Sequence, residues 1–290
     1  GETLVNRVRI KGNRPVAVEI VHRGRFSEVE TERVVLCAGT YGSPSILLRS
    51  GIGPAEDLKS LGVVTNINLP GVGHNLHDHV SIKLKYPGTN YLSSLMEKVS
   101  TIFTEQSIAK FRSSHCKEAF DLHVYPTSAL ESHGEHQWES ILSVANMAPK
   151  SRGKLMLRSK DPQAIPYIDT GYLTDQGDFD VNVLSDGVIL TREIANHPEL
   201  KTLIGQESSD SSNIQDLQSI KRNCFHYYHP VGTCKMGPIS DPTAVVDADG
   251  LLHGTKNFYI ADASIMPVIP RANTNLPTLM IAERIAARIV

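Results

Sequence analysis

The feature of this sequence that most constrains its fold is the segment 33–53, where an apolar stretch runs into a glycine-bearing turn and a helix-forming stretch. Its first five residues are nearly all apolar and lead to Gly39, a pattern typical of a strand buried on both faces of a sheet in an α/β protein. Ser43 followed by Pro44 predicts a helix N-terminus, and Gly51 predicts the end of that helix. A strand, a turn and a helix N-terminus in this order present backbone N–H groups to an anionic or carbonyl-bearing ligand.

The rest of the chain predicts a mixture of strands and helices. Alternating and β-branched segments predict further strands at 5–10, 15–21, 80–86, 120–125, 140–145, 154–157, 244–246 and 257–261. Helices are predicted at 54–61, 180–196 and 277–290, and a polar surface loop is predicted at 205–213. The sequence therefore predicts an α/β protein, or an α+β one, with two domains.

Composition excludes several classes of protein. Across 290 residues, Lys and Arg number 29 and Asp and Glu number 31, with no basic stripe, which argues against a nucleic-acid or anionic-membrane partner. No apolar run approaches the roughly 20 residues of a membrane span. The four cysteines are scattered, which favours buried free thiols over a disulfide framework. No feature of the sequence indicates a compartment.

A candidate active site lies in the last quarter of the chain. His226 and His229 stand among aromatic residues, and His229 runs directly into Pro-Val-Gly-Thr. An imidazole titrates near neutrality, so it can take and return a proton at working pH. About forty residues later, Asn273 lies in a polar turn that leads into an apolar helix. The alternatives are a buried structural histidine and a zinc site with Cys224 and Cys234, whose spacing matches no common finger.

Five segments, in order, resemble the motifs of the glucose–methanol–choline (GMC) flavoprotein oxidoreductases. They are 39–53, with Gly-Thr, Ser-Pro, Ile-Leu and Ser-Gly-Ile-Gly in place; Gly71-Val-Gly-His-Asn-Leu-His-Asp-His79; Tyr228-His-Pro-Val-Gly-Thr-Cys-Lys-Met-Gly237; Asp262-Ala-Ser-Ile-Met-Pro267; and 273–284. Residues of about 85–220 resemble the family only loosely, as a substrate domain that varies with its substrate would.

The resemblance implies FAD-dependent oxidation of a small-molecule alcohol to the carbonyl, with hydride transfer to flavin N5. His229 would be the general base, and Asn273 would hold the substrate oxygen or help to orient the base. His226 is expected to be structural. Two alternatives stay open, a flavin-containing lyase of the hydroxynitrile lyase type and a non-catalytic subunit of a heteromer. The resemblance identifies neither the substrate nor the electron acceptor.

The resemblance also implies which residues lie against FAD. The set is Gly39, Thr40, Asn75, Asp78, His79, Asp262, Ala263, Thr274, Asn275 and Thr278. The N-terminus of the last helix would face the flavin edge that gains negative charge on reduction. The competing interpretations are an ordinary packed helix, a capped loop at 71–79, a simple turn at Asp262 and a three-histidine metal site at His74, His77 and His79.

The domain assignment follows from the same resemblance. Residues 1–79 and 223–290 would form part of a Rossmann-like FAD-binding domain, and residues 80–222 the substrate domain. The family's GxGxxG turn, which receives the FAD pyrophosphate, is absent from the 290 residues. We therefore expect a split or cleaved enzyme in which a complementary N-terminal FAD-binding chain or fragment is tightly associated.

Overall fold

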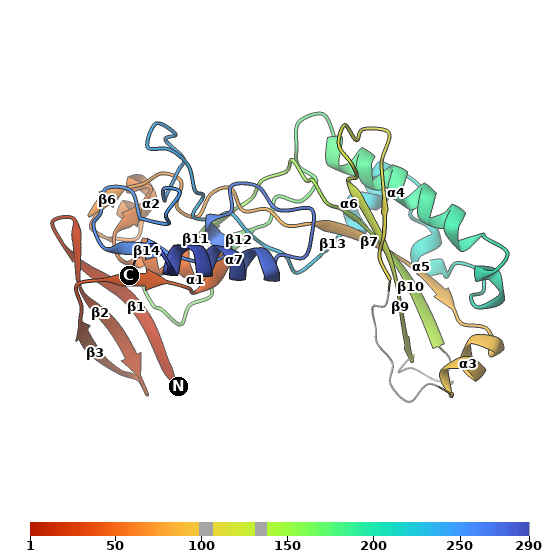
Figure 1. The fold of residues 1–290 in the computed structure, drawn as a ribbon, viewed down its shortest axis with the longest axis horizontal. Coiled ribbons are helices and arrows are strands. Elements are labelled where there is room, and N and C mark those ends of the chain that lie inside the picture. The colour runs from red at the N-terminus through yellow and green to blue at the C-terminus, as the bar shows by residue number, and fades with distance from the viewer. Residues whose placement is uncertain (99–106, 131–137, 290) are drawn as a thin grey trace. The chain divides into compact units, whose positions relative to one another are not determined.

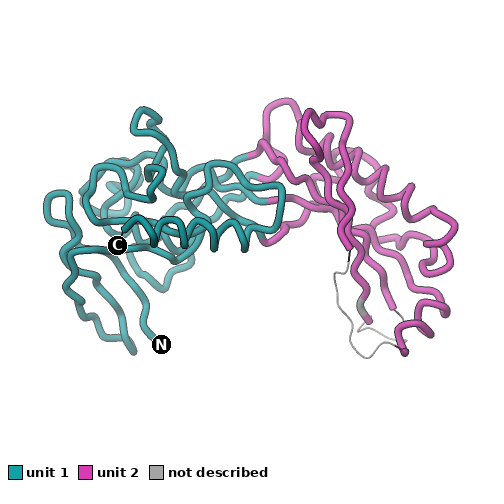
Figure 2. The backbone as a smooth tube through the Cα atoms, in the orientation of Figure 1, with its two compact units in different colours: residues 1–78, 152–171, 229–290 teal, residues 79–151, 172–228 magenta. Residues whose placement is uncertain are grey.

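The structure is a computed structural model that describes residues 1–98, 107–130 and 138–289, and it divides the chain into two compact units (Figures 1 and 2). Unit 1 comprises 1–78, 152–171 and 229–290, and unit 2 comprises 79–151 and 172–228. The sequence assigned 152–171 to the substrate domain, whereas the structure groups this segment with unit 1. The reason is backbone pairing, since Leu76 and Gly153 exchange hydrogen bonds of 3.1 and 2.7 Å.

Unit 1 opens with an antiparallel three-stranded sheet. Its strands are β1 (Thr3–Lys11), β2 (Arg14–His22) and β3 (Arg25–Glu30). The first two were predicted. The third was missed because it is exposed along its whole length and carries mostly polar residues, so no apolar alternation marks it.

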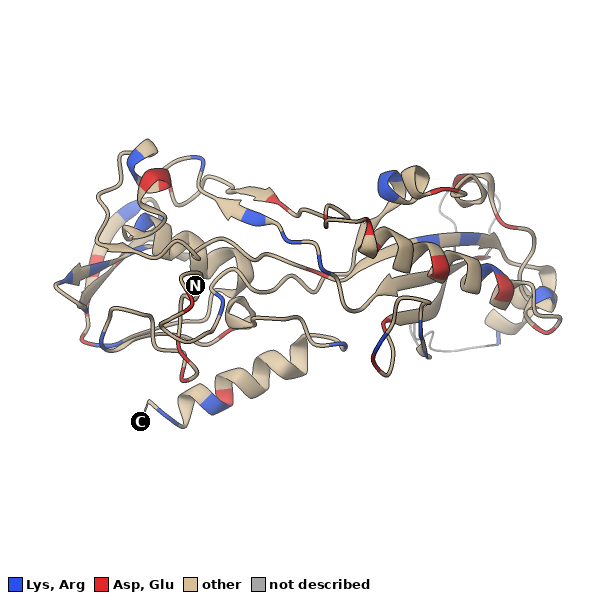
Figure 3. Ribbon diagram, turned by 90° about the horizontal axis from the view of Figure 1, so that it is seen from above, with Lys and Arg blue, Asp and Glu red and all other residues tan. Residues whose placement is uncertain are grey.

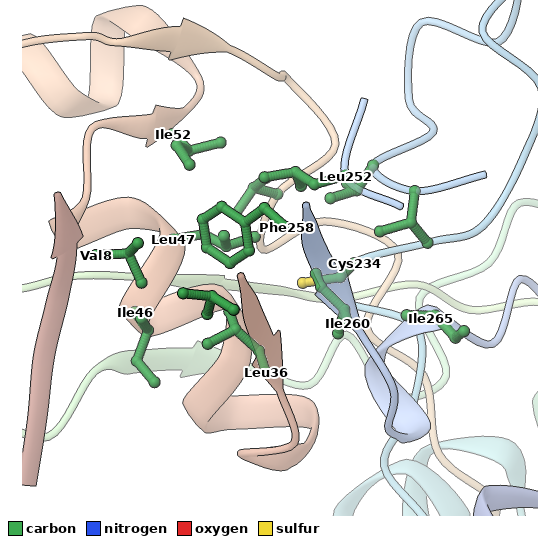
Figure 4. Close-up of a cluster of buried hydrophobic side chains, with 14 of the residues drawn as sticks. Val8, Leu36, Ile46, Leu47, Ile52, Cys234, Leu252, Phe258, Ile260 and Ile265 are labelled. Carbon is green, nitrogen blue, oxygen red and sulfur yellow. The ribbon is translucent and has the colours of Figure 1, made fainter. Parts of the chain in front are cut away.

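The core of unit 1 forms around a parallel pair of short strands, β4 (Val34–Leu36) and β14 (Phe258–Ile260). Leu36, Phe258 and Ile260 are buried with side chains from α1 and β1 (Figure 4). Val35, however, is 36% exposed, so this strand has one buried face and not the two that the sequence predicted. The predicted strand at 244–246 is also absent, because Val246 forms only isolated bridges with Met236 and Leu252.

Helix α1 (Gly39–Arg49) begins four residues before the predicted Ser43 N-cap. The Ser43 hydroxyl instead accepts a hydrogen bond from Ala38 N and donates one to Asp262. The other elements of unit 1 are β5 (Ile52–Gly53) parallel to β6 (Ile67–Asn68), α2 (Ala55–Ser60), β11 (Lys154–Met156) antiparallel to β12 (Tyr167–Asp169), the 3-10 turn η2 (Ala263–Ile265) and α7 (Asn275–Ala286).

Unit 2 is an antiparallel sheet covered by a long helix. The sheet has the order β13 (Phe225–His226), β7 (Val80–Pro87), β10 (Trp138–Asn146), β9 (Leu122–Leu130) and β8 (Ala109–Phe111). Helix α4 (Phe179–Ala195) packs on it through the predicted stripe of Val181, Leu184 and Val188.

The smaller helices of unit 2 complete its fold. They are α3 (Asn90–Met96), η1 (Leu200–Thr202), α5 (Ser209–Ser212) and α6 (Leu217–Asn223). Helix α5 lies within the segment that was predicted as a surface loop. Among the residues that the structure describes, no helix is both long and apolar enough to cross a bilayer.

The two units together give the mixed α/β, two-part architecture that the sequence predicted.

Candidate active site

His229 begins the last segment of unit 1, and a buried carboxylate holds its backbone. The His229 N–H donates to Asp78 Oδ1 at 2.9 Å, and Asp78 is buried. Two residues later, Val231 exchanges backbone hydrogen bonds of 3.2 and 2.9 Å with His77. The histidine block and the 71–79 loop, which the sequence singled out separately, are therefore joined in the fold.

Asp262 connects the end of β14 to the start of α1. Its Oδ2 accepts hydrogen bonds from Gly39 N at 3.0 Å and Ser43 Oγ at 2.5 Å, and its Oδ1 accepts one from Ser264 N at 2.8 Å. The side chain is buried. Two of the predicted cofactor-binding residues, Gly39 and Asp262, thus meet. Protein donors therefore occupy both carboxylate oxygens, and the N–H groups of Gly39 and Ser264 are already bound to Asp262.

Thr40 ties the start of α1 to the histidine block. Its hydroxyl donates to Pro230 O at 2.7 Å, and its own carbonyl accepts a hydrogen bond from Thr233 Oγ1 at 2.5 Å. Gly232, between these two contacts, has a φ of +95°, and a Cβ there would lie 2.6 Å from Asn75 O. A residue with a side chain would therefore push the block away from the 71–79 loop.

Asn75 and His77 organise that loop. Asn75 adopts a left-handed φ of 60°, its Nδ2 donates to Gly232 O at 3.3 Å and to Pro267 O at 3.4 Å, and its Oδ1 accepts from Arg152 Nε at 2.9 Å. His77 Nε2 accepts a hydrogen bond from Ile269 N at 3.0 Å, while Nδ1 lies 2.7 Å from Asn75 O. This organising role of His77 was not predicted from the sequence. The only sequence signal is its place in the loop motif, since Ile269 is 192 residues away.

Asn273 lies in the turn before α7 and is exposed. In the described part of the chain it forms no hydrogen bond, so its amide is available to a ligand. A small apolar cluster of Val231, Met266 and Ile269, with Ile281 of α7 packed against it, holds this turn near the histidine block. At the start of α7, the backbone N–H and hydroxyl of Thr278 both donate to Thr274 O, at 3.0 and 2.7 Å.

His79 is the predicted site residue that falls in unit 2. Its ring is buried and packs edge-on against Tyr227, with centroids 5.9 Å apart. Within the described residues, no three His, Cys, Asp or Glu side chains are grouped so that they could hold a metal ion. His77 is committed to two protein hydrogen bonds, which leaves it no nitrogen for a three-histidine metal site.

Burial sets the electrostatics of these groups. Desolvation lowers the pKa of His229 below its ordinary value, which favours the neutral imidazole. Desolvation, together with the charge of Arg152, lowers the pKa of His77 to about 4. Burial and the charge of Asp78 raise the pKa of Tyr41, in the first turn of α1. The candidate base is therefore unprotonated at neutral pH.

Two backbone features of unit 1 fit an anionic cofactor. Helix α7 carries no acidic residue in its first turn and keeps partial positive charge at its N-terminus, whereas at the start of α1 the Asp262 carboxylate already binds Gly39 N. Ala263 N, which begins η2, donates to no group in the described chain and is partly exposed. The η2 turn packs against both helices. The start of α7 and the Ala263 N–H therefore suit an anionic ligand.

Comparisons with known families give one consistent result. A family model described as GMC oxidoreductase matches residues 2–81, and a second model of the same description matches residues 149–282. Choline dehydrogenase, mitochondrial, from Homo sapiens is 35% identical over 98% of this chain and 52% of its own length. Oxygen-dependent choline dehydrogenase 1 from Chromohalobacter salexigens is 32% identical over 97% of this chain and 55% of its own. The chain spans about half the length of these curated relatives.

Solved structures agree with the fold. Pyridoxine 4-oxidase from Mesorbium loti superposes with a TM-score of 0.84 at 27% identity, over 99% of this chain and 57% of its own. Formate oxidase from Aspergillus oryzae RIB40 superposes with a TM-score of 0.85 at 20% identity, over 99% of this chain and 60% of its own. At that lower identity, the likeness concerns the fold alone.

Proposed function

Because this chain belongs to the GMC oxidoreductase family, we propose that it carries the catalytic base of an FAD-dependent oxidation of an alcohol to a carbonyl compound. The cofactor of this family is FAD. The names of two kinds of relative specify choline and pyridoxine, both of which carry a hydroxyl group on carbon. That shared group supports the substrate class, a primary or secondary alcohol, and not one particular alcohol.

His229 takes the proton of the alcohol in this proposal. The observation that carries it is the fixed backbone of the histidine, since Asp78 binds the His229 N–H and Thr40 binds the carbonyl of Pro230. Burial lowers its pKa, so the ring is neutral and basic at neutral pH. As the O–H proton moves to His229, the C–O bond becomes C=O and a hydride leaves the carbon. FAD, when bound, supplies the hydride acceptor at N5.

Asn273 orients the reacting oxygen. Its amide can donate a hydrogen bond to the alcohol oxygen without competing for the proton, because an amide does not titrate at working pH. Its exposure, and the absence of any hydrogen bond to it in the described chain, support this role. The apolar cluster around Ile269 and Ile281 would keep the turn in place during the reaction.

We assign the FAD contacts to groups at the start of α1, at Ala263 and at the start of α7. The backbone N–H groups at the start of α1, after Gly39, and at Ala263 would bind phosphate oxygens, which helix N-termini favour. The start of α7, at Thr274, Asn275 and Thr278, would stabilise the negative charge of the reduced flavin. Asn75 and Asp78 would act by holding the 71–79 loop against the histidine block, because their side chains already bind protein groups.

We also propose that a dinucleotide-binding segment with a GxGxxG turn, in the same polypeptide or a second chain, covers one face of unit 1. Helix α7 exposes Leu276, Leu279 and Met280 at i, i+3 and i+4, and Leu276 is 75% exposed. Val35 of β4 is exposed as well. A row of exposed apolar side chains on one helix face is typical of a surface that another segment covers. The 290 residues contain no GxGxxG turn of their own.

The experiment is anaerobic mixing of the flavin-containing holoprotein with a panel of alcohols that includes choline and pyridoxine. We expect one of them to bleach the flavin absorbance, and His229→Asn to slow bleaching by about 10²–10⁴-fold. The bleaching rate of the wild type should fall as the pH falls through the lowered pKa of His229, below the ordinary value of 6.5.

The matched control is His197→Asn, an exposed histidine just after α4, which should leave the rate unchanged. A protein that binds no flavin would overturn the proposal. Flavin that stays oxidised with every alcohol while a cyanohydrin is cleaved would identify a lyase instead. Equal rates for His229→Asn and the wild type would remove His229 from the role of base.

A further inference from the structure

A cavity in unit 1 lies apart from the residues assigned to catalysis. It has a volume of about 540 Å³, and strands β1 and β2, the end of α1 and the turn after α2 form its walls. That volume is in the range of small-molecule sites. None of the proposed catalytic or FAD-binding residues lines it.

Its most unusual wall residue is Arg49, the last residue of α1. The side chain is only 8% exposed, and Nε donates to Asn6 O at 2.7 Å while Nη2 donates to Val5 O at 3.3 Å. No carboxylate within the described residues forms an ion pair with it, although the charge of Asp161 acts on it from further away. A buried cation without a counter-charge is costly, so an anion bound beside Arg49 would be strongly stabilised.

Asn6 adds a hydrogen-bond acceptor to the same cavity. The register of β1 against β2 shifts between Val5 and Arg7, and this bulge turns the Asn6 side chain inward, where it is 8% exposed. Its Nδ2 donates to Glu19 Oε1, whereas Oδ1 is buried and has no hydrogen-bond partner in the described chain. A ligand with a hydroxyl donor would satisfy this oxygen.

More positively charged than negatively charged side chains line the cavity. Arg7, Arg49 and Lys160 line it against one carboxylate, Glu19, which Arg7 already binds at 3.1 and 3.0 Å. Lys160 is exposed and forms no ion pair among the described residues; its Nζ lies 3.9 Å from where a Cβ on Gly62 would be. Elsewhere, charges of both signs are interspersed along the chain (Figure 3), whose net charge is −2. The excess is therefore local to this cavity.

We propose that this cavity binds a phosphate monoester of a small hydroxylated molecule. A phosphate dianion can accept hydrogen bonds from a guanidinium and an ammonium at the same time. Arg49 supplies the guanidinium in this cavity and Lys160 supplies the ammonium. A hydroxyl of the esterified molecule would donate to Asn6 Oδ1. Inorganic phosphate has the same anionic group without that hydroxyl, so the two sources can be distinguished by affinity. The site is independent of the flavin chemistry.

The test is isothermal titration of the holoprotein, at low ionic strength, with inorganic phosphate and with glycerol 3-phosphate. We expect both to bind saturably and the ester to bind more tightly. Lys160→Glu should weaken the binding of both by about tenfold or more, because it reverses a charge beside the anion. Lys160 makes no ion pair in the described chain, so this variant keeps the fold. Added salt should weaken binding as well.

Lys117→Glu is the control, since Lys117 is an exposed lysine of unit 2 that lies outside the cavity. It should change the affinity by less than about twofold, as a distant surface charge is screened. Equal losses in the two variants would show a general charge effect and overturn the proposal. An absence of saturable binding by either compound would overturn it too. Tighter binding of inorganic phosphate than of the ester would remove the assigned role of Asn6.

Discussion

At the scale of single residues, His77 shows how burial selects one protonation state. Ile269 N–H donates to His77 Nε2, so Nε2 must be the acceptor, and Nδ1 must carry the proton that it donates to Asn75 O. Only the neutral ring satisfies both contacts. Burial and the charge of Arg152 lower its pKa to about 4, in agreement with the hydrogen bonds.

This arrangement predicts a loss of stability in acid. The unfolded chain gains a proton on His77 near pH 6.5, whereas the folded chain gains it only near pH 4, so the folded state binds fewer protons in between. Stability from His77 is complete above about pH 6.5 and is lost as the pH falls toward 4, to an extent of about 3 kcal/mol. Urea unfolding from pH 7 to pH 4 measures it. The same pH dependence in His77→Gln would contradict the prediction.

At the scale of elements, the junction of β14 and α1 depends on one carboxylate. Asp262 accepts hydrogen bonds from Gly39, Ser43 and Ser264, and thereby fixes the helix N-terminus that we propose for phosphate binding. Helix α1 has no side-chain cap of its own. Asp262, which follows β14, therefore supplies the cap, and it lies 219 residues from Ser43 in the sequence.

Removing that carboxylate should destabilise the fold. Asp262→Ala leaves buried N–H donors unsatisfied, so we expect the free energy of unfolding to fall by about 2–4 kcal/mol. Asp249→Ala is the control, since among the described residues the Asp249 side chain forms a solvent-accessible ion pair of 3.3 Å with Arg288, worth less than about 1 kcal/mol, and its backbone N–H is kept in the variant. Chemical denaturation of both variants compares them. Similar losses in the two would show that Asp262 is not the capping group.

At the scale of the whole molecule, what the sequence predicted and what it missed have a common physical basis. Local sequence pattern predicted α4, β7 and β10, because each buries many of its apolar side chains along its length. It missed β3, which buries nothing, and it placed the start of α1 at Ser43, because the true capping group is remote. The family motifs led to the candidate site, yet the link from His77 to Ile269 exists only in the folded chain.

The exposed face of α7 carries the prediction that concerns the assembled protein. Leu279 is exposed in the described chain, so Leu279→Glu should leave the folding of unit 1 unchanged. If a dinucleotide-binding segment covers this face, the new carboxylate is buried without a partner, which costs several kcal/mol and should release the segment together with FAD. Flavin content per polypeptide, from absorbance after size-exclusion chromatography, measures the effect. Ile239→Glu, at another exposed apolar side chain of unit 1, should keep its flavin. Full flavin retention by Leu279→Glu would mean that no such segment covers α7.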